Sequence, residues 1–323
     1  MEEKKPLISI ICAVRNDERF ILETLQTVTS QTYDNWELII MDGASTDGTV
    51  GIIEKYIKKH SNIILYSESD HGQWEALDKA LYLSKGEYLF ILCGQDGYLD
   101  NNWFERCVQV FKEKSEISLV WGIPFNMSED GKLTGPHYAY ANFLKDGQYG
   151  NSQIKPISTV VAKLDLSRPG SFKRLWRLIT KITPSRIIKL FRSFFKRDIP
   201  KKEDWFFYWL QTGLPFPEGN MCVRKNVYLQ NTIRFPKETM TNKALLDFCF
   251  NFNSRGYLSY GLSVAAGFGR LHLGGQPLRK YDSRVVANYK QQVLNFRKKT
   301  KKQKVFKFVD PNGNIISERI LNS

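Results

Sequence analysis

Apolar runs and amphipathic stretches alternate through the first hundred residues of the chain. The apolar runs have the length of strands and occupy residues 7–14, 36–41, 63–67 and 88–93. Each run is followed by a stretch whose apolar positions recur at helical spacing, over residues 18–31, 48–60, 73–84 and 102–111. Strands that alternate with helices in this way build βαβ units around a mostly parallel sheet. The pattern therefore predicts an α/β fold with a Rossmann-like central sheet flanked by helices.

The pattern loosens after a further predicted strand at 118–122. Turn signals at Asp130-Gly131 and Asp146-Gly147 indicate antiparallel or irregular additions to the sheet. Helical spacing returns over 242–254 and again from residue 282 onward. We therefore divide the chain into a first half (1–125), a second half (126–281) and a helical, basic C-terminal tail (282–323).

A basic segment at 171–197 interrupts the second half. It carries nine Lys or Arg residues and no acidic residue, interleaved with aromatic and aliphatic side chains, and it is broken at Thr183-Pro184. This predicts a basic amphipathic helical pair within an insertion spanning 168–202. Two interpretations remain open. The segment is either an interfacial helix that lies on an anionic membrane surface, which is our hypothesis, or a solvent-exposed basic face that covers the core.

The composition narrows the class of protein. The chain has 323 residues, of which 42% are hydrophobic and 25% charged, so it is globular rather than disordered or collagenous. Its formal net charge of +14 favours an anionic partner, which can be nucleic acid, a membrane surface or a phosphorylated ligand. We expect no nucleic acid partner, because no known nucleic-acid-binding module occurs in the sequence.

The cysteines and the apolar runs bear on localisation. The five cysteines include no CxxC pair and mostly lie in apolar runs, as expected of buried, reduced thiols in a cytoplasmic protein. The N-terminus has no signal-peptide pattern, and no apolar run reaches the roughly 18 residues of a transmembrane helix. We therefore expect a cytoplasmic protein that is peripheral at the inner face of the cell membrane.

Polar loops that bear carboxylates follow four successive predicted strands. The loops are Arg15-Asn16-Asp17, residues 42–49, residues 68–72 and Gly94-Gln95-Asp96-Gly97. Taken singly, each is an ordinary turn; in the second loop, Asp42 would start the turn and Asp47 or Thr46 would cap the next helix. Taken together they indicate a site, because ligands of open α/β sheets bind at the carboxyl ends of the strands.

The motifs in these loops resemble those of family 2 glycosyltransferases with the GT-A fold. The resemblance rests on residues 8–16, 30–33, 36–49, 67–80, 86–88, 219–225, 247–256 and 270–275. It covers roughly two thirds of the chain and leaves out 125–215. It implies a GT-A fold and an enzyme that uses a nucleotide-sugar donor.

The resemblance also implies roles for individual residues. Ala13, Arg15, Asp42 and Asp70 would contact the nucleotide; Asp42 can accept the imide hydrogen of uracil, and the Arg15 guanidinium can stack on the base in place of the usual aromatic ring. Asp96 matches the last aspartate of the metal-binding pair, whose first position holds Gln95. Asp96, the donor diphosphate and water would hold Mn²⁺ or Mg²⁺. His272 is a further candidate metal ligand, although a lone histidine is more often structural.

An inverting transfer needs a base for the acceptor hydroxyl. In the family this is a carboxylate just before a helix, and the resemblance assigns it to Asp247, the second position of the family pattern. Leu245 stands at the first position, where the base is usual. Asp247 is either the base or a helix-pairing residue, and Glu203-Asp204 is an outside candidate.

These inferences predict a metal-dependent glycosyltransferase of the hexosyltransferase type. It would move one sugar, non-processively and with inversion, from a UDP-sugar to a saccharide or lipid-linked saccharide acceptor in cell-surface polysaccharide synthesis. One alternative is a catalytically inactive GT-A protein that binds a nucleotide-sugar or polysaccharide, because Gln95 and Leu245 depart from the pattern. A nucleotidyltransferase is disfavoured, since residues 13–16 lack a Gly-rich basic signature.

Overall fold

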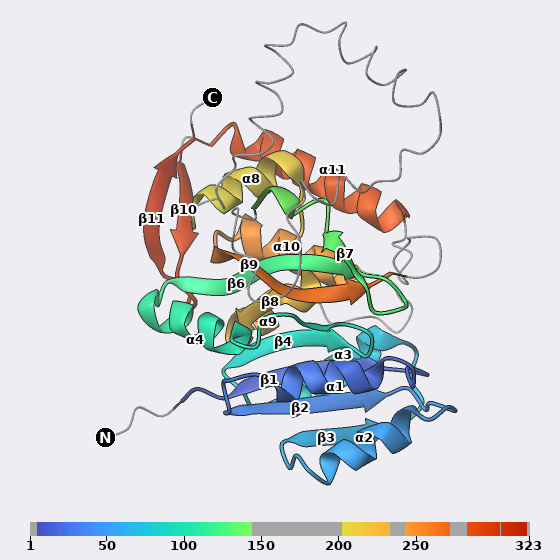
Figure 1. The fold of residues 1–323 in the computed structure, drawn as a ribbon. Helices are drawn as coiled ribbons and strands as arrows, with labels where there is room; N and C mark the ends of the chain where they lie inside the picture. The colour runs from blue at the N-terminus through green and yellow to red at the C-terminus, as the bar shows by residue number, and fades with distance from the viewer. Residues whose placement is uncertain (1–4, 144–201, 233–242, 272–282, 304, 322–323) are drawn as a thin grey trace, which may run out of the picture.

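The first half of the chain forms four parallel strands joined by helices, as the sequence pattern predicts (Figure 1). The computed structural model describes residues 5–143, 202–232, 243–271, 283–303 and 305–321. The elements of this half are β1 (Ile8–Val14), α1 (Ile21–Thr29), β2 (Trp36–Asp42), α2 (Thr49–Ile57), β3 (Ile63–Ser67), α3 (Gln73–Leu83) and β4 (Tyr88–Cys93). Because βαβ crossovers are right-handed, α1 and α2 cover one face of these strands and α3 covers the other.

Strand β1 is the centre of this parallel half. It pairs with β2 on one side and with β4 on the other, so that Ile11 lies level with both Ile39 and Ile91. All seven residues of β1 are buried. Strands covered on both faces read as unbroken apolar runs, which is why the sequence pattern located this strand.

The part of the chain after β4 adds mostly antiparallel strands to the same sheet. Its elements are β5 (Gly97–Tyr98), α4 (Trp103–Glu113), β6 (Ile117–Met127), β7 (Leu133–Pro136), β8 (Met221–Arg224) and β9 (Leu258–Arg270). The described strands form a sheet in the order β3-β2-β1-β4-β8-β6-β9-β5, with β7 paired to β6. This mixed sheet flanked by helices confirms the predicted fold class.

The remaining helices and a C-terminal hairpin pack together beside the antiparallel half (Figure 1). They are α8 (Asp204–Thr212), α9 (Lys225–Asn231), α10 (Lys243–Ser254), α11 (Ser283–Thr300), β10 (Val305–Val309) and β11 (Ile315–Ile320). An aromatic cluster joins them: Phe206 of α8 stacks on Phe306 of β10 at 4.0 Å between centroids, and the Trp209 indole N–H donates to the Tyr289 hydroxyl of α11 at 2.8 Å.

The tail differs from the prediction of a helical segment over 282–323, because the hairpin follows α11. The sequence carries a signal for it. A turn-forming Pro-Asn-Gly at 311–313 separates two short runs, and Asp310 Oδ1 accepts the backbone N–H groups of Asn312 and Asn314. Within the described residues no helix is long and apolar enough to cross a membrane. The predicted basic helical pair at 171–197 lies outside the described residues.

Truncating Phe306 tests whether the hairpin is part of the core. We expect Phe306→Ala to lower the free energy of unfolding by about 3–5 kcal/mol, because the ring is buried against Phe206 and Phe308. Urea denaturation measures this loss, and Val305→Ala, at a position that is 37% exposed, is the matched control. Equal, small effects of both substitutions would mean that the hairpin docks without stabilising the fold.

Candidate functional site

The loops that follow β1 and β2 are tied into one surface by hydrogen bonds. The Asn16 side-chain oxygen accepts the Thr46 N–H at 2.9 Å, and the Asn16 N–H donates to the Ser45 hydroxyl at 2.8 Å. The Glu18 carboxylate accepts the Gly48 N–H at 2.6 Å. These contacts fix both loops at the carboxyl edge of the parallel strands, where the sequence predicts the site.

Asp42 ends β2 and is 1% exposed. Its carboxylate accepts the Ser45 N–H at 2.9 Å, the Ser45 hydroxyl, and the Ser67 hydroxyl at 2.7 Å. Asp42 therefore organises the turn after β2 and links it to the end of β3. Asp47 directly precedes Gly48, the N-cap residue of α2, and its carboxylate accepts the Thr49 N–H at 3.0 Å.

The side chains of Arg15 and Asp70 both lie close to Gly43. A Cβ atom placed on Gly43 would lie 3.0 Å from the Asp70 Oδ2 and 3.3 Å from the Arg15 Cδ. Asp70 is held in place by the Gly72 N–H, which donates to its Oδ1 at 2.8 Å, and Arg15 is exposed. The structure thus brings Arg15, Asp42 and Asp70 together. Ala13 is buried within β1, where it pairs with Met41 and Cys93.

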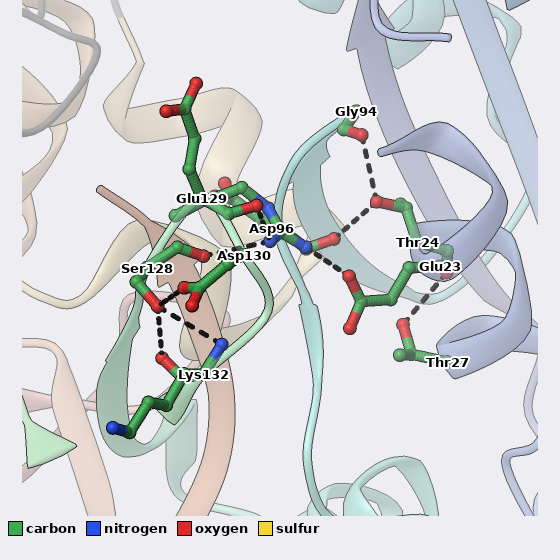
Figure 2. Close-up of polar contacts among 10 residues, drawn as sticks. Glu23, Thr24, Thr27, Gly94, Asp96, Ser128, Glu129, Asp130 and Lys132 are labelled. Carbon is green, nitrogen blue, oxygen red and sulfur yellow. Dashed lines mark hydrogen bonds and ion pairs between the residues drawn. The ribbon is translucent and has the colours of Figure 1, made fainter. Parts of the chain in front are cut away.

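Thr24 of α1 holds the turn that carries Asp96 (Figure 2). The Thr24 hydroxyl lies 3.0 Å from the Gly94 carbonyl oxygen and 2.7 Å from that of Asp96. The neighbouring Gln95 amide donates to the buried Asp17 carboxylate in the loop after β1. The Asp96 turn is therefore fixed to the surface formed by the first two loops.

Small residues of the second half flank the Asp96 carboxylate. A Cβ atom on Gly219 would lie 3.8 Å from Oδ2, and one on Gly269 would lie 3.7 Å from Oδ1. Gly219 belongs to the 3₁₀ turn Glu218–Asn220, and Gly269 lies near the end of β9. Asp96 therefore stands where the two halves of the sheet meet.

Arg270, at the end of β9, joins this region to α1. Its side chain is 2% exposed and forms an ion pair with Glu23, beside Thr24. It also donates to the Ser128 carbonyl at 3.0 Å and lies 4.4 Å from the centroid of the Phe20 ring. Figure 2 shows Glu23 and Thr24 reaching from one helix toward the Ser128 turn and the Asp96 turn. The sequence analysis did not single out Glu23 and Thr24, because a Glu and a Thr beside the apolar stripe of a helix carry no functional signal of their own.

Asp96 fits a divalent cation only as a single carboxylate ligand. Its predicted partner position, Gln95, turns its amide to Asp17, and His272 lies outside the described residues. No group of three or more His, Cys, Asp and Glu side chains that could hold a metal occurs in the described part of the chain. A cation held by Asp96 would therefore need its other ligands from a diphosphate and water.

Asp247 lies in the first turns of α10, with a side chain that is 12% exposed. Burial raises its pKa above the ordinary value of 3.8, while Lys243, whose Nζ is 3.6 Å from Oδ2, opposes the shift. Leu245 is 4% exposed and belongs to the core. Glu203 and Asp204 both bind Arg319 of β11, so this acidic pair anchors the hairpin.

The chain matches the model of glycosyl transferase family 2 over residues 9–174, about half of its length. Among curated proteins it is similar to the putative teichuronic acid biosynthesis glycosyltransferase TuaG of Bacillus subtilis, 34% identical over 132 residues, which are 41% of this chain and 52% of that protein. It is also 24% identical over 144 residues to chondroitin synthase of Escherichia coli, covering 45% of this chain and 21% of that one. The chain thus spans about half the length, or less, of these relatives.

The fold has solved counterparts. A structure of TarS 1-349 from S. aureus in complex with UDP-GlcNAc superposes with a TM-score of 0.54 at 16% identity, covering 89% of this chain and 66% of that one. A second structure of TarS 1-349 superposes with a TM-score of 0.53 at 15% identity, covering 90% of this chain and 64% of that one. The likeness supports the GT-A fold that the sequence resemblance implies. From the family match and the strand-end motifs that lie within it, the chain belongs to glycosyl transferase family 2.

Proposed function

We propose that the protein moves one sugar, with inversion and non-processively, from a UDP-sugar to a saccharide or lipid-linked saccharide in cell-surface polysaccharide synthesis. The observation that carries the proposal is the convergence of Arg15, Asp42 and Asp70 around Gly43, next to the Asp96 turn. The UDP-GlcNAc named for TarS and the teichuronic acid named for TuaG support the donor and the pathway class.

In this proposal, the nucleoside binds at Gly43, between the loops that carry Arg15, Asp42 and Asp70. The Arg15 guanidinium is exposed and free to stack on a base, and Asp42 and Asp70 supply acceptor oxygens for base and ribose. Ala13 contributes only backbone and a small side chain beneath the loops. Asp96, with His272 as a second candidate, holds Mn²⁺ or Mg²⁺, which would supply positive charge to the leaving diphosphate.

Asp247 is the proposed base. A general base works best when its pKa lies closer to the working pH than that of an exposed aspartate, and burial moves the Asp247 pKa in that direction. Lys243 stands near enough to tune the charge of the carboxylate. The proposed peripheral location at the inner membrane face rests on residues 171–197, whose basic amphipathic sequence suits anionic lipid.

A catalytically inactive, nucleotide-sugar-binding protein is the second candidate. Two observations favour it. Gln95 has its amide committed to Asp17 rather than standing as a carboxylate ligand, and Leu245 is buried in the core at the position usual for the base. Transfer or hydrolysis of a donor separates the two candidates.

Gly43→Ala tests the nucleoside site. The added methyl group would stand 3.0 Å from Asp70 and push it and Arg15 apart, so we expect the Kd for UDP to rise about tenfold or more, as for overpacked sites. Isothermal titration calorimetry measures the Kd. Gly51→Ala on α2 is the matched control, because nothing lies within 4 Å of its Cβ position. Unchanged UDP affinity in Gly43→Ala would place the nucleotide elsewhere.

Asp96→Ala tests the metal. We expect Mn²⁺ to tighten UDP binding by the wild-type protein and to have no such effect on Asp96→Ala, because the cation loses its protein carboxylate. Asp34→Ala removes an exposed carboxylate that pairs with Lys5 and should keep the full Mn²⁺ effect. If Mn²⁺ leaves wild-type UDP affinity unchanged, the metal-dependent form of the proposal is wrong.

Asp247→Asn tests the base. We expect kcat to fall about 100-fold or more with little change in donor KM. Burial raises the pKa of Asp247 in the folded state above 3.8, so ionising the carboxylate lowers the free energy of unfolding as pH rises through that raised pKa. At neutral pH, Asp247→Asn should therefore be at least as stable as the wild type. Thermal denaturation measures the stability.

The pH profile distinguishes a base from a structural carboxylate. Since Lys243 lowers the Asp247 pKa, Lys243→Met should move the acidic limb of kcat to higher pH. A limb that stays in place, or an Asp247→Asn variant with wild-type kcat, would assign the base to another residue.

A further inference from the structure

The exposed side of α11 is basic. The helix packs on the core through Tyr289, Val293 and Thr300. Lys290, Leu294, Lys298 and Lys301 recur at spacings of four, four and three residues and are all exposed, so they form one stripe that continues past the end of the helix. Lys299 and Lys302 flank this stripe and are also exposed.

Acidic residues do not offset this charge within the segment. From Ser283 to Val309 the sequence contains no Asp or Glu. On α3, by contrast, Lys79 forms ion pairs with Glu68 at 2.6 Å and with Glu75 at 3.1 Å. Clustered like charges repel one another and favour an anionic partner over solvent. A basic helix C-terminus also complements the helix dipole, but that effect is confined to the last turn and does not account for Lys290.

Apolar side chains accompany the lysines. Leu294 lies within the stripe and is 47% exposed. The hairpin that follows α11 opens with the cross-strand pair Val305 and Ile320, which are 37% and 76% exposed. In Figure 1 this end of the hairpin lies beside the C-terminal end of α11. Basic and apolar side chains therefore share one exposed region, which is the composition of an interfacial membrane surface.

We propose that this α11 surface, defined as Lys290, Leu294, Lys298, Lys299, Lys301, Lys302, Val305 and Ile320, binds a bilayer that contains anionic lipid. The lysines would form ion pairs with the phosphates of the lipid head groups, and the apolar side chains would insert at the boundary between head groups and acyl chains. The exposed aliphatic side chains favour a bilayer over nucleic acid. Proteins bind single strands by stacking their bases on aromatic rings, and the α11 surface contains no aromatic residue. The α11 surface as defined includes none of residues 171–197, and the proposal does not depend on the proposed transfer reaction.

The arrangement also sets an orientation. α11 and α2 lie at opposite ends of the molecule (Figure 1), so a bilayer on the α11 surface leaves α2 away from the membrane. Lys58 and Lys59 at the end of α2 are exposed and provide a control of equal charge. Replacing two lysines by glutamates changes the net charge equally at either end of the molecule, but only the α11 pair belongs to the proposed membrane contact.

Vesicle flotation of the full chain tests the proposal. We expect the wild type to float with phosphatidylcholine vesicles that contain phosphatidylglycerol, not with pure phosphatidylcholine, and to be released at high salt. Lys298→Glu/Lys301→Glu should lower the partition coefficient about tenfold or more, while Lys58→Glu/Lys59→Glu should float nearly as the wild type does.

Three outcomes would overturn the proposal: wild type that ignores the anionic lipid, equal loss of binding in both double variants, or an α11 variant that floats like the wild type because another segment carries the contact. Binding of the wild type to DNA but not to vesicles would assign the surface to nucleic acid instead. Salt release of the wild type shows only that the contact is electrostatic, and the comparison of the two double variants assigns it to α11. UDP titration of the α11 variant separates this test from the proposed function, since donor affinity should be unchanged.

Discussion

The pairing of β1 between β2 and β4 is the constraint on which the site depends. It sets Val14 level with Asp42 and Ala13 level with Cys93, so that the loops after the three strands begin at one edge of the sheet. A slip of one residue would turn every side chain of β1 to the opposite face and move Arg15 out of line with Gly43. Because both faces of β1 are buried, a slip would keep its apolar residues covered, but it would disrupt the close packing of their side chains and break the buried hydrogen bond from the Ser9 hydroxyl to Glu37.

Helix α1 extends this constraint to the second half of the chain. Glu23 and Thr24 are adjacent, and they bind Arg270 at the end of β9 and the turn that carries Asp96. Arg270 is nearly inaccessible, so its charge requires a partner at this place in the fold. The position of β9 relative to the parallel strands is thus coupled to the position of Asp96 through two consecutive side chains (Figure 2).

The sequence predicts the parallel half well because its strands and helices are local and periodic, and because β1, β2 and β4 are almost wholly buried. It also predicts that Arg15, Asp42, Asp70 and Asp96 share an edge, since parallel topology alone requires this. The contact between Glu23 and Arg270 spans 247 positions, and nothing local to either residue reveals it. Likewise, Gln95 reads as a lost metal ligand in the sequence, and only the fold shows that its amide binds Asp17.

Three carboxylates, Asp42, Asp70 and Asp96, stand at one edge of a protein whose formal net charge is +14. Asp42 is satisfied by Ser45 and Ser67, so its charge is spread over neighbouring hydroxyl and amide groups. A diphosphate placed beside Asp96 would still face like charge at close range, where the interaction is poorly screened. Arg15 lies beside Gly43, on the nucleoside side of the proposed site. Within the proposal, a cation at Asp96 would offset the repulsion between that carboxylate and the diphosphate. The positive charge of α11 lies on another part of the molecule and would be screened by solvent before it reached the diphosphate.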